Sequence, residues 1–258
     1  MITVKNLSKH FGGIKAVDGV DLHIDKGSIT GLVGPNGAGK TTMFNLIAGL
    51  YQPTEGEIIL DGEDVTELTS HQLFHKGLLR TFQIAHEFPT LSVLENLMMV
   101  PANQLGEILM NTWLKRRQIQ EEEKLLQEKA EEVIDFLSIS HLKNERAGNL
   151  SGGQKKLLEL ARTMMVDAKV VLLDEVGAGV NRTLLKQIGD AILRLNSERG
   201  YTFCMIEHDM DFISRLCNPV VVLAEGQILT TGTPDEIKSS DAVIEAYLGK
   251  GIKTEVAT

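Results

Sequence analysis

Cysteine is scarce in this chain, since its 258 residues include only Cys204 and Cys217. Two cysteines are too few for a disulfide framework, and they do not form a zinc-binding pattern. Cys204 lies in an apolar run that ends at Ile206, so we expect it to pack in the core. Of the seven histidines, His208 alone is given a role below, and we expect the other six to be structural or surface residues. The sequence gives no indication of redox chemistry.

Long apolar runs and an excess of positive charge are also missing. No apolar run approaches the roughly 18 residues that cross a bilayer, and the residues from Met1 to Asn6 lack the pattern of a signal peptide, so we expect a cytoplasmic location. Lysine and arginine number 26 against 35 aspartates and glutamates, a net charge of −9. This balance argues against nucleic acid as a partner and against attraction to a membrane surface.

What is present is a pattern of strands alternating with helices. Alternation at Val20, Leu22 and Ile24 predicts a β-rich N-terminal part. The apolar run 29–33 leads through a glycine-rich turn into a helical pattern, and further buried strands are predicted at 170–173 and 201–206. The fold class predicted is therefore α/β, with a mainly parallel core sheet and an N-terminal antiparallel subdomain.

A helical insertion interrupts this pattern. Ser92 and Glu95 have the spacing of a capping box, and a helical stripe of apolar residues follows. We predict a single domain of residues 1–258, in which 1–83 and 166–258 form the catalytic core with the β subdomain and 84–165 form the helical subdomain. A hairpin around Glu225 and Gly226 and a final helix ending near Leu248 complete the prediction.

The turn after the first buried strand fits G-x-x-x-x-G-K-[ST], the phosphate loop of P-loop NTPases, and it lies between a strand and a helix as that motif requires. Glycines let backbone amides crowd around phosphate oxygens, and the helix N-terminus adds positive charge. The lysine is positioned to neutralise the β- and γ-phosphates of ATP, and the first threonine to ligate Mg²⁺. The residues assigned to the nucleotide here are Asn36, Gly37, Ala38, Gly39, Lys40, Thr41 and Thr42.

Two carboxylates end the buried strand 170–173, where open α/β sheets bind ligands. We assign Asp174 to Mg²⁺ and Glu175 to the role of general base on the attacking water. The alternative is an ordinary acidic pair at a strand end.

Residues 150–154 read Leu-Ser-Gly-Gly-Gln. Ser151 and Gln154 have capping-box spacing ahead of a helical apolar pattern, so a second helix start is offered to an anion. Ser151, Gly152, Gly153 and Gln154 are assigned to nucleotide binding on this basis. The alternative is a plain helix cap.

Together these motifs resemble those of the ATP-binding subunits of ABC transporters, over essentially the whole chain. The resemblance implies ATP hydrolysis, and it implies that residues 150–154 close over the nucleotide on a second ATPase subunit, so that two subunits share two ATP molecules. It assigns Gln83 to Mg²⁺, to the catalytic water and to signalling to the membrane subunits. His208 corresponds to the residue that contacts the γ-phosphate, and Phe11 to the aromatic that stacks on adenine.

Within this family the chain is most similar to the larger ATPase of branched-chain amino acid importers. That resemblance implies a homo- or heterodimer of ATPases on two transmembrane permease subunits, with a substrate-binding protein acting indirectly, at the cytoplasmic face of the inner membrane. We expect the contact with the permeases near Phe88, Pro89 and Leu91. Val176 and Asn181 depart from the usual family pattern, although this subclass commonly has Asn at the second position.

Other interpretations stay open from the sequence. The solute imported could be another small molecule, such as an amide or urea, or the transporter could be an exporter, because its direction is decided by other subunits. A soluble ABC ATPase that acts on nucleic acid is less compatible with the negative net charge and the single cassette. If the chain were a P-loop kinase or GTPase, residues 150–154 would have no function.

Overall fold

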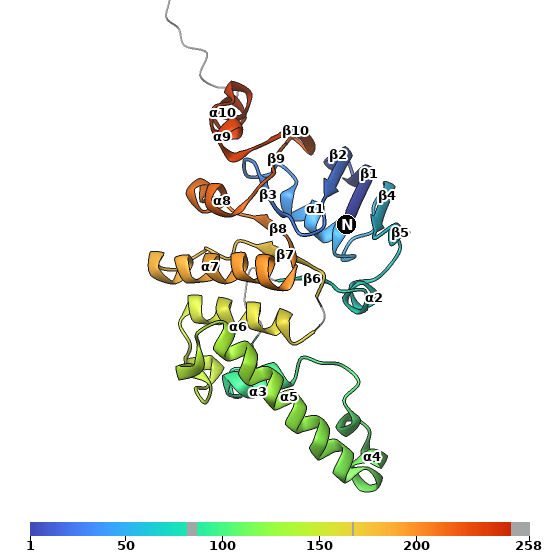
Figure 1. Ribbon diagram of the computed structural model, residues 1–258. Coiled ribbons are helices and arrows are strands. Elements are labelled where there is room, and N and C mark those ends of the chain that lie inside the picture. Colours follow the sequence, from blue (N-terminus) through green and yellow to red (C-terminus); the bar gives the residue numbers. More distant parts are fainter. Residues whose placement is uncertain (82–86, 167, 249–258) are drawn as a thin grey trace, which may run out of the picture. The chain divides into compact units, whose positions relative to one another are not determined.

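The computed structural model describes residues 1–81, 87–166 and 168–248 (Figure 1). The chain forms two compact units. The core unit comprises the described residues of Met1–Arg80, Lys169–Val176 and Ile192–Thr258, and the helical unit comprises those of Thr81–Ala168 and Gly177–Ala191. The predicted α/β class is confirmed, whereas the domain limits taken from the sequence stay a prediction. Each unit is described by itself below.

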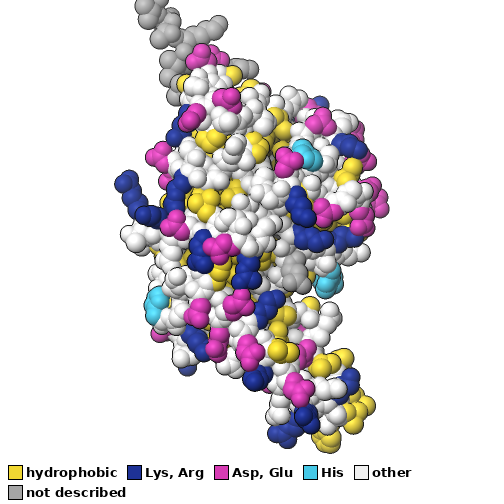
Figure 2. Space-filling model, in the orientation of Figure 1, with side chains coloured by type: hydrophobic (Ala, Val, Ile, Leu, Met, Phe, Trp, Pro, Cys, Tyr) yellow, Lys and Arg dark blue, Asp and Glu magenta, His cyan; other side chains and the backbone are white. Residues whose placement is uncertain are grey.

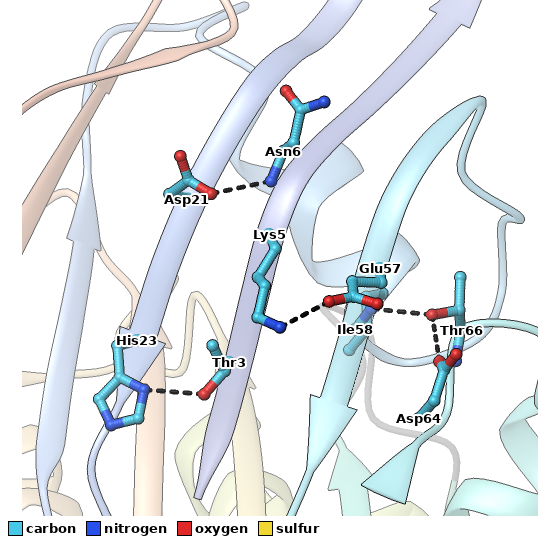
Figure 3. Close-up of polar contacts among 9 residues, drawn as sticks. All are labelled: Thr3, Lys5, Asn6, Asp21, His23, Glu57, Ile58, Asp64 and Thr66. Atoms are coloured by element: carbon cyan, nitrogen blue, oxygen red, sulfur yellow. Dashed lines mark hydrogen bonds and ion pairs between the residues drawn. The ribbon is translucent and has the colours of Figure 1, made fainter. Parts of the chain in front are cut away.

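An antiparallel sheet in the order β2-β1-β4-β5 forms the N-terminal part of the core unit. Apolar side chains alternate inward along its strands, as Val20, Leu22 and Ile24 of β2 show by their burial. The opposite face carries polar cross-strand contacts (Figure 3), among them a 2.6 Å ion pair from Lys5 Nζ to Glu57 Oε1. The strands are β1 (Ile2–Phe11), β2 (Ile14–Ile24), β4 (Glu55–Leu60) and β5 (Glu63–Asp64).

A six-stranded sheet in the order β10-β9-β3-β8-β7-β6 forms the centre of the core unit. Its strands pair in parallel except for the antiparallel hairpin of β9 and β10. Every residue of β3, β7 and β8 is buried, which explains their continuous apolar sequences. Because these strands are parallel, their carboxyl ends meet at one edge. The strands are β3 (Ile29–Val33), β6 (Leu78–Arg80), β7 (Val170–Asp174), β8 (Thr202–Ile206), β9 (Val220–Ala224) and β10 (Gln227–Gly232).

One hydrophobic cluster holds the core unit together. Met43, Phe44 and Ile47 of α1 are fully buried in it, with side chains from both sheets. Cys204 of β8 is buried as expected, and burial raises the pKa of its thiol to about 12. The helices that lie wholly in this unit are α1 (Lys40–Ile47), α2 (Ser70–His75), α8 (Met210–Leu216), α9 (Pro234–Lys238) and α10 (Asp241–Leu248).

The helical unit packs around apolar residues of α3, α5 and α6. The predicted capping box of Ser92 and Glu95 is confirmed at the start of α3. Within the described ranges, no helix has both the length and the apolar character needed to cross a bilayer. The elements are α3 (Val93–Met98), η1 (Leu105–Glu107), α4 (Leu109–Leu114), α5 (Arg116–Phe136), η2 (Ser140–Leu142), η3 (Ala147–Asn149), α6 (Gly152–Met164) and the first ten residues of α7 (Arg182–Arg199).

Candidate functional site

The phosphate loop connects β3 to α1 in a conformation that glycine alone allows at two positions. Gly34 has a φ of 148° and Gly39 a φ of 101°. A Cβ atom on Gly34 would lie 2.0 Å from the carbonyl oxygen of Leu223, and one on Gly39 would lie 2.2 Å from that of Ala16. The loop is therefore pressed against the backbones of β9 and β2, and a side chain at either glycine would displace it.

The start of α1 has no side-chain cap and no acidic residue in its first turn. No side chain therefore caps the first amides of this helix or neutralises the positive end of its dipole. Lys40 is buried, and its Nζ donates hydrogen bonds to the carbonyl oxygens of Gly34 at 2.7 Å and Pro35 at 3.0 Å. Burial lowers the pKa of Lys40, while the charges of Glu175 and Asp174 act in the opposite direction. This helix start concentrates positive potential at the loop.

A cleft of about 440 Å³ opens beside the loop. It brings together the seven loop residues predicted from the sequence with Glu175 and His208. The sequence analysis missed the rest of the lining, which comes from the start of β2 and from the β9–β10 turn, because no local motif marks these positions. The lining residues are Ile14, Lys15, Ala16, Asn36, Gly37, Ala38, Gly39, Lys40, Thr41, Thr42, Glu175, His208 and Glu225.

Glu175 and His208 meet at the carboxyl ends of β7 and β8. Glu175 has a φ of 49°, an uncommon value for a residue other than glycine, and its amide donates to the carbonyl oxygen of Ile206 at 3.0 Å. Its Oε1 atom lies 2.9 Å from His208 Nε2. Since a carboxylate accepts hydrogen bonds, the imidazole donates through Nε2. The strained turn therefore directs the carboxylate toward the histidine.

Asp174 is held by an arginine that the sequence analysis did not identify. Arg80, the last residue of β6, lies 2.7 Å from Asp174 Oδ2 through Nη2, and both side chains are nearly buried. Arg80 Nη1 also donates to Asn45 Oδ1 of α1. Arg80 lies only three residues before Gln83, but a single arginine at the end of a short apolar run carries no recognisable signal. The ion pair fixes the carboxylate of Asp174 relative to α1.

Oxygen donors suited to a hard cation lie at the start of α1 and at the end of β7. Thr41 supplies a hydroxyl at the start of α1, and Asp174 supplies a carboxylate with capacity for several acceptor contacts. Gln83, the third residue assigned to Mg²⁺, lies outside the described residues. The donor set of Thr41 and Asp174 fits Mg²⁺, which prefers carboxylate, hydroxyl and water oxygens.

The second predicted helix start belongs to the helical unit. Ser151 is the N-cap of α6, and the capping box with Gln154 is present: Ser151 Oγ accepts from the Gln154 amide, and Gln154 Oε1 accepts from the Ser151 amide at 2.8 Å. Gly152 is exposed, whereas Gly153 is buried, and a Cβ there would lie 2.2 Å from Leu184 Cδ2. The capping box uses the amides of Ser151 and Gln154, so it leaves those of Gly152 and Gly153 at the helix start.

Asn181, one of the two departures from the family pattern, has a structural role within the same unit. Its Oδ1 accepts a hydrogen bond from the Leu184 amide at 3.0 Å, at the start of α7. Asparagine and aspartate are comparably good caps, so the substitution preserves the helix start. Val176, the other departure, is buried.

Two further positions have contacts that the sequence did not predict. Phe11, at the end of β1, contacts Tyr51 edge to face at 5.6 Å between ring centroids and is not among the described residues that line the cleft. His71 and His75 stand four residues apart on α2 with their Nε2 atoms 3.3 Å apart, a spacing that the interpretation of the histidines overlooked. No group of three or more metal-ligating side chains forms in the described part of the chain.

Known proteins match the chain over nearly its whole length. A family model described as "ABC transporter" matches residues 17–178, and one described as "Branched-chain amino acid ATP-binding cassette transporter" matches residues 227–253. The chain is 39% identical over 249 residues to the probable branched-chain amino acid transport ATP-binding protein LivG of Archaeoglobus fulgidus, covering 96% of this chain and 95% of that protein. It is 36% identical over 250 residues to the high-affinity branched-chain amino acid transport ATP-binding protein BraF of Pseudomonas aeruginosa, covering 97% and 98%.

A solved structure agrees with these sequence matches. An ATP-binding cassette of an ABC transporter in its ADP conformation is 36% identical to this chain, with a TM-score of 0.82 and coverage of 97% of this chain and 99% of that one. The phosphate loop, the cleft and the capped start of α6 occur in this chain within that fold. The chain therefore belongs to the ABC transporter family, as one of its ATP-binding and ATP-hydrolysing cassettes.

Proposed function

We propose that this chain is the ATPase subunit of a binding-protein-dependent importer of branched-chain or related amino acids. The observation that carries the proposal is the convergence of Lys40, Glu175 and His208 on one cleft, in a chain that is similar along its length to ATP-binding proteins of branched-chain amino acid transport. The match of residues 227–253 to a model of branched-chain transporters supports the same solute class.

The cleft residues divide the chemistry of hydrolysis among them. The loop amides from Asn36 to Thr42 and the ammonium of Lys40 bind the β- and γ-phosphates. Glu175 takes the proton from the attacking water, and His208, 2.9 Å from it, orients that carboxylate and faces the γ-phosphate. Phe11, whose side chain is 45% exposed, remains the residue proposed to stack on adenine.

Mg²⁺ would be held by Thr41 and Asp174, with Gln83 as a further oxygen donor. When bound, the ion neutralises charge that develops on the phosphate oxygens. Arg80 prepares this site, because it pairs with Asp174 Oδ2 and thereby fixes the direction of the carboxylate. Arg80 is thus a positioning residue rather than a ligand.

We further propose that Ser151, Gly152, Gly153 and Gln154 bind the nucleotide held by the loop of a second ATPase subunit, identical or paralogous. Gly152, an exposed residue at the start of a 13-residue helix, supports this role. In a Glu175→Gln background, Ser151→Arg should leave ATP binding by the monomer intact and prevent the ATP-dependent dimer in sizing chromatography.

The matched control for this experiment is Thr233→Arg, which alters the capping box of α9 in the core unit. It removes an equivalent N-cap while leaving α6 unchanged, so the dimer should persist. A dimer that forms equally well with Ser151→Arg would contradict the shared nucleotide site.

The complete assembly would contain two such ATPases, two permease subunits at the cytoplasmic face of the inner membrane and an external binding protein. Proteoliposomes that contain this assembly test both solute and direction. With ATP enclosed with the ATPases and binding protein on the opposite side, labelled leucine should move toward the ATPases. Uptake of urea or a short amide in place of leucine would contradict the proposed solute class. Movement of leucine away from the ATPases would establish export.

A further inference from the structure

A patch of exposed apolar side chains covers one end of the helical unit. Trp113 is 90% exposed, Leu109 85%, Leu114 76%, Met110 70% and Ile108 58%. We call these five residues the α4 patch. Leu109 and Trp113 stand four residues apart, as do Met110 and Leu114, so they form adjoining rows on one face of α4. In Figure 2, hydrophobic and basic side chains lie together over this helix.

Folding does not use this apolar face. Asn111, on the other side of α4, donates from Nδ2 to the carbonyl oxygen of Leu105 in η1 at 3.1 Å. The amide of Leu105 in turn donates to Glu122 Oε2 of α5 at 2.8 Å. Polar groups thus attach the segment to the unit while its apolar side chains face outward, the reverse of the usual pattern. An exposed cluster of this kind marks an interaction surface.

The charge beside the patch identifies the partner that fits it. Lys115, Arg116 and Arg117 follow directly and are exposed. Arg117 pairs with Glu121 at 3.1 Å, whereas no ion pair of Lys115 or Arg116 occurs within the described part of the chain. Residues 101–118 contain these three basic residues and one acidic residue, Glu107, in a chain whose net charge is −9. The basic charge is therefore local, and it lies next to the apolar face.

A tryptophan and aliphatic side chains bordered by lysine and arginine form the pattern of a segment that lies at a membrane interface. The indole and the aliphatic chains enter the headgroup region, and the basic groups meet anionic lipid phosphates. We propose that the α4 patch, together with Lys115 and Arg116, is a contact site for an anionic membrane surface. This proposal goes beyond the proposed function, because it places the chain on the lipid itself and not only on permease subunits. It also revises the expectation from the net charge, which conceals the local patch.

The single tryptophan of the chain provides a direct measurement. The purified full chain without nucleotide is mixed with vesicles of phosphatidylcholine, with or without phosphatidylglycerol. We expect the emission maximum of Trp113 to shift to shorter wavelength and the protein to sediment with the phosphatidylglycerol vesicles, and much less with phosphatidylcholine alone. Because no ATP is present, failure here leaves the ATPase assignment untouched.

Two pairs of variants test which residues act. Lys115→Gln/Arg116→Gln should weaken vesicle binding about 30-fold, whereas the charge-matched Lys26→Gln/Arg194→Gln in the core unit should bind as the parent does. Leu109→Ser/Met110→Ser keeps the fluorescent probe and should weaken binding about tenfold or more, with the half-exposed Leu229→Ser of β10 as its control. Since all these side chains are exposed, thermal unfolding midpoints should match the parent.

Three outcomes would overturn the proposal. The first is the absence of sedimentation with anionic vesicles. The second is sedimentation that the patch variants leave unchanged. The third is a shift of Trp113 emission that grows with protein concentration without lipid, which would assign the patch to a second copy of the chain.

Discussion

The two helix starts assigned to phosphate, those of α1 and α6, are built in different ways. α1 begins at Gly39 with no side-chain cap, and the buried ammonium of Lys40 lies beside it. α6 has Ser151 as its N-cap, with a complete capping box and an exposed Gly152 as its first residue. Since a capped helix satisfies part of its own amides, α6 is stable without a ligand, whereas α1 leaves its amides to whatever binds the loop. The comparison supports the proposal that α1 belongs to the primary site and that α6 contributes to a site on a second subunit.

The largest effect should be on ATP hydrolysis, at the cleft beside α1. Glu175→Gln should slow ATP hydrolysis by about 10²- to 10⁴-fold, the range for losing a general base, while ATP binding stays intact. Phosphate release and nucleotide titration measure the two properties separately. The cleft offers a second carboxylate, Glu225, and if Glu225→Gln slowed hydrolysis while Glu175→Gln did not, the assignment of the base would be wrong.

The next effect concerns the support of the α1 site. Arg80→Met should lower the free energy of unfolding by about 3–5 kcal/mol, because it removes the nearly buried guanidinium that pairs with the buried carboxylate of Asp174. Urea unfolding of the purified chain provides the measurement. Lys5→Met is the control, since it breaks an ion pair with Glu57 that is largely exposed and should cost at most about 1 kcal/mol. Equal losses of unfolding free energy in the two variants would contradict the positioning role proposed for Arg80.

These effects separate what the sequence could predict from what it could not. The phosphate loop, the acidic pair after β7 and the capping box of α6 depend on neighbouring residues, so local spacing predicts them. Arg80 and Glu225 reach the site through strand pairing between distant segments, and no local pattern reports such contacts. Buried apolar runs indicate parallel strands, so the sequence predicts that the core sheet is mainly parallel. The order of the strands within the sheet depends on the same long-range pairing, and the sequence does not predict it.

The same distinction explains why the sequence did not predict the α4 patch or the contact of Phe11 with Tyr51. Net charge averages over the chain and conceals a local basic cluster, so the sequence analysis discounted any membrane attraction. The expectation for Phe11 came from family resemblance, whereas its contact with Tyr51 is made by a side chain forty residues away. Side-chain direction of this kind follows from packing rather than from spacing.

An intermediate effect distinguishes the two lysines of the cleft. Lys40→Ala should weaken ATP binding by about 10- to 100-fold, because hydrogen bonds to a charged group are lost at the phosphates. Lys15→Ala should weaken it less, since Lys15 is 61% exposed and lies 3.1 Å from Asp18. Nucleotide titration of both variants gives the comparison, and an unchanged affinity in Lys40→Ala would contradict the function assigned to the loop.

The smallest effect should come from substituting the N-cap of α6. It decides whether that helix start has more than a structural role. Ser151→Ala should cost about 1 kcal/mol of unfolding free energy, as should Thr233→Ala, because both remove the N-cap of a capping box. If α6 completes a neighbour's site, Ser151→Ala should also lower ATP hydrolysis at protein concentrations where dimers form, and Thr233→Ala should not. Equal hydrolysis by the two variants, at matched stability, would mean that the serine serves its own helix alone.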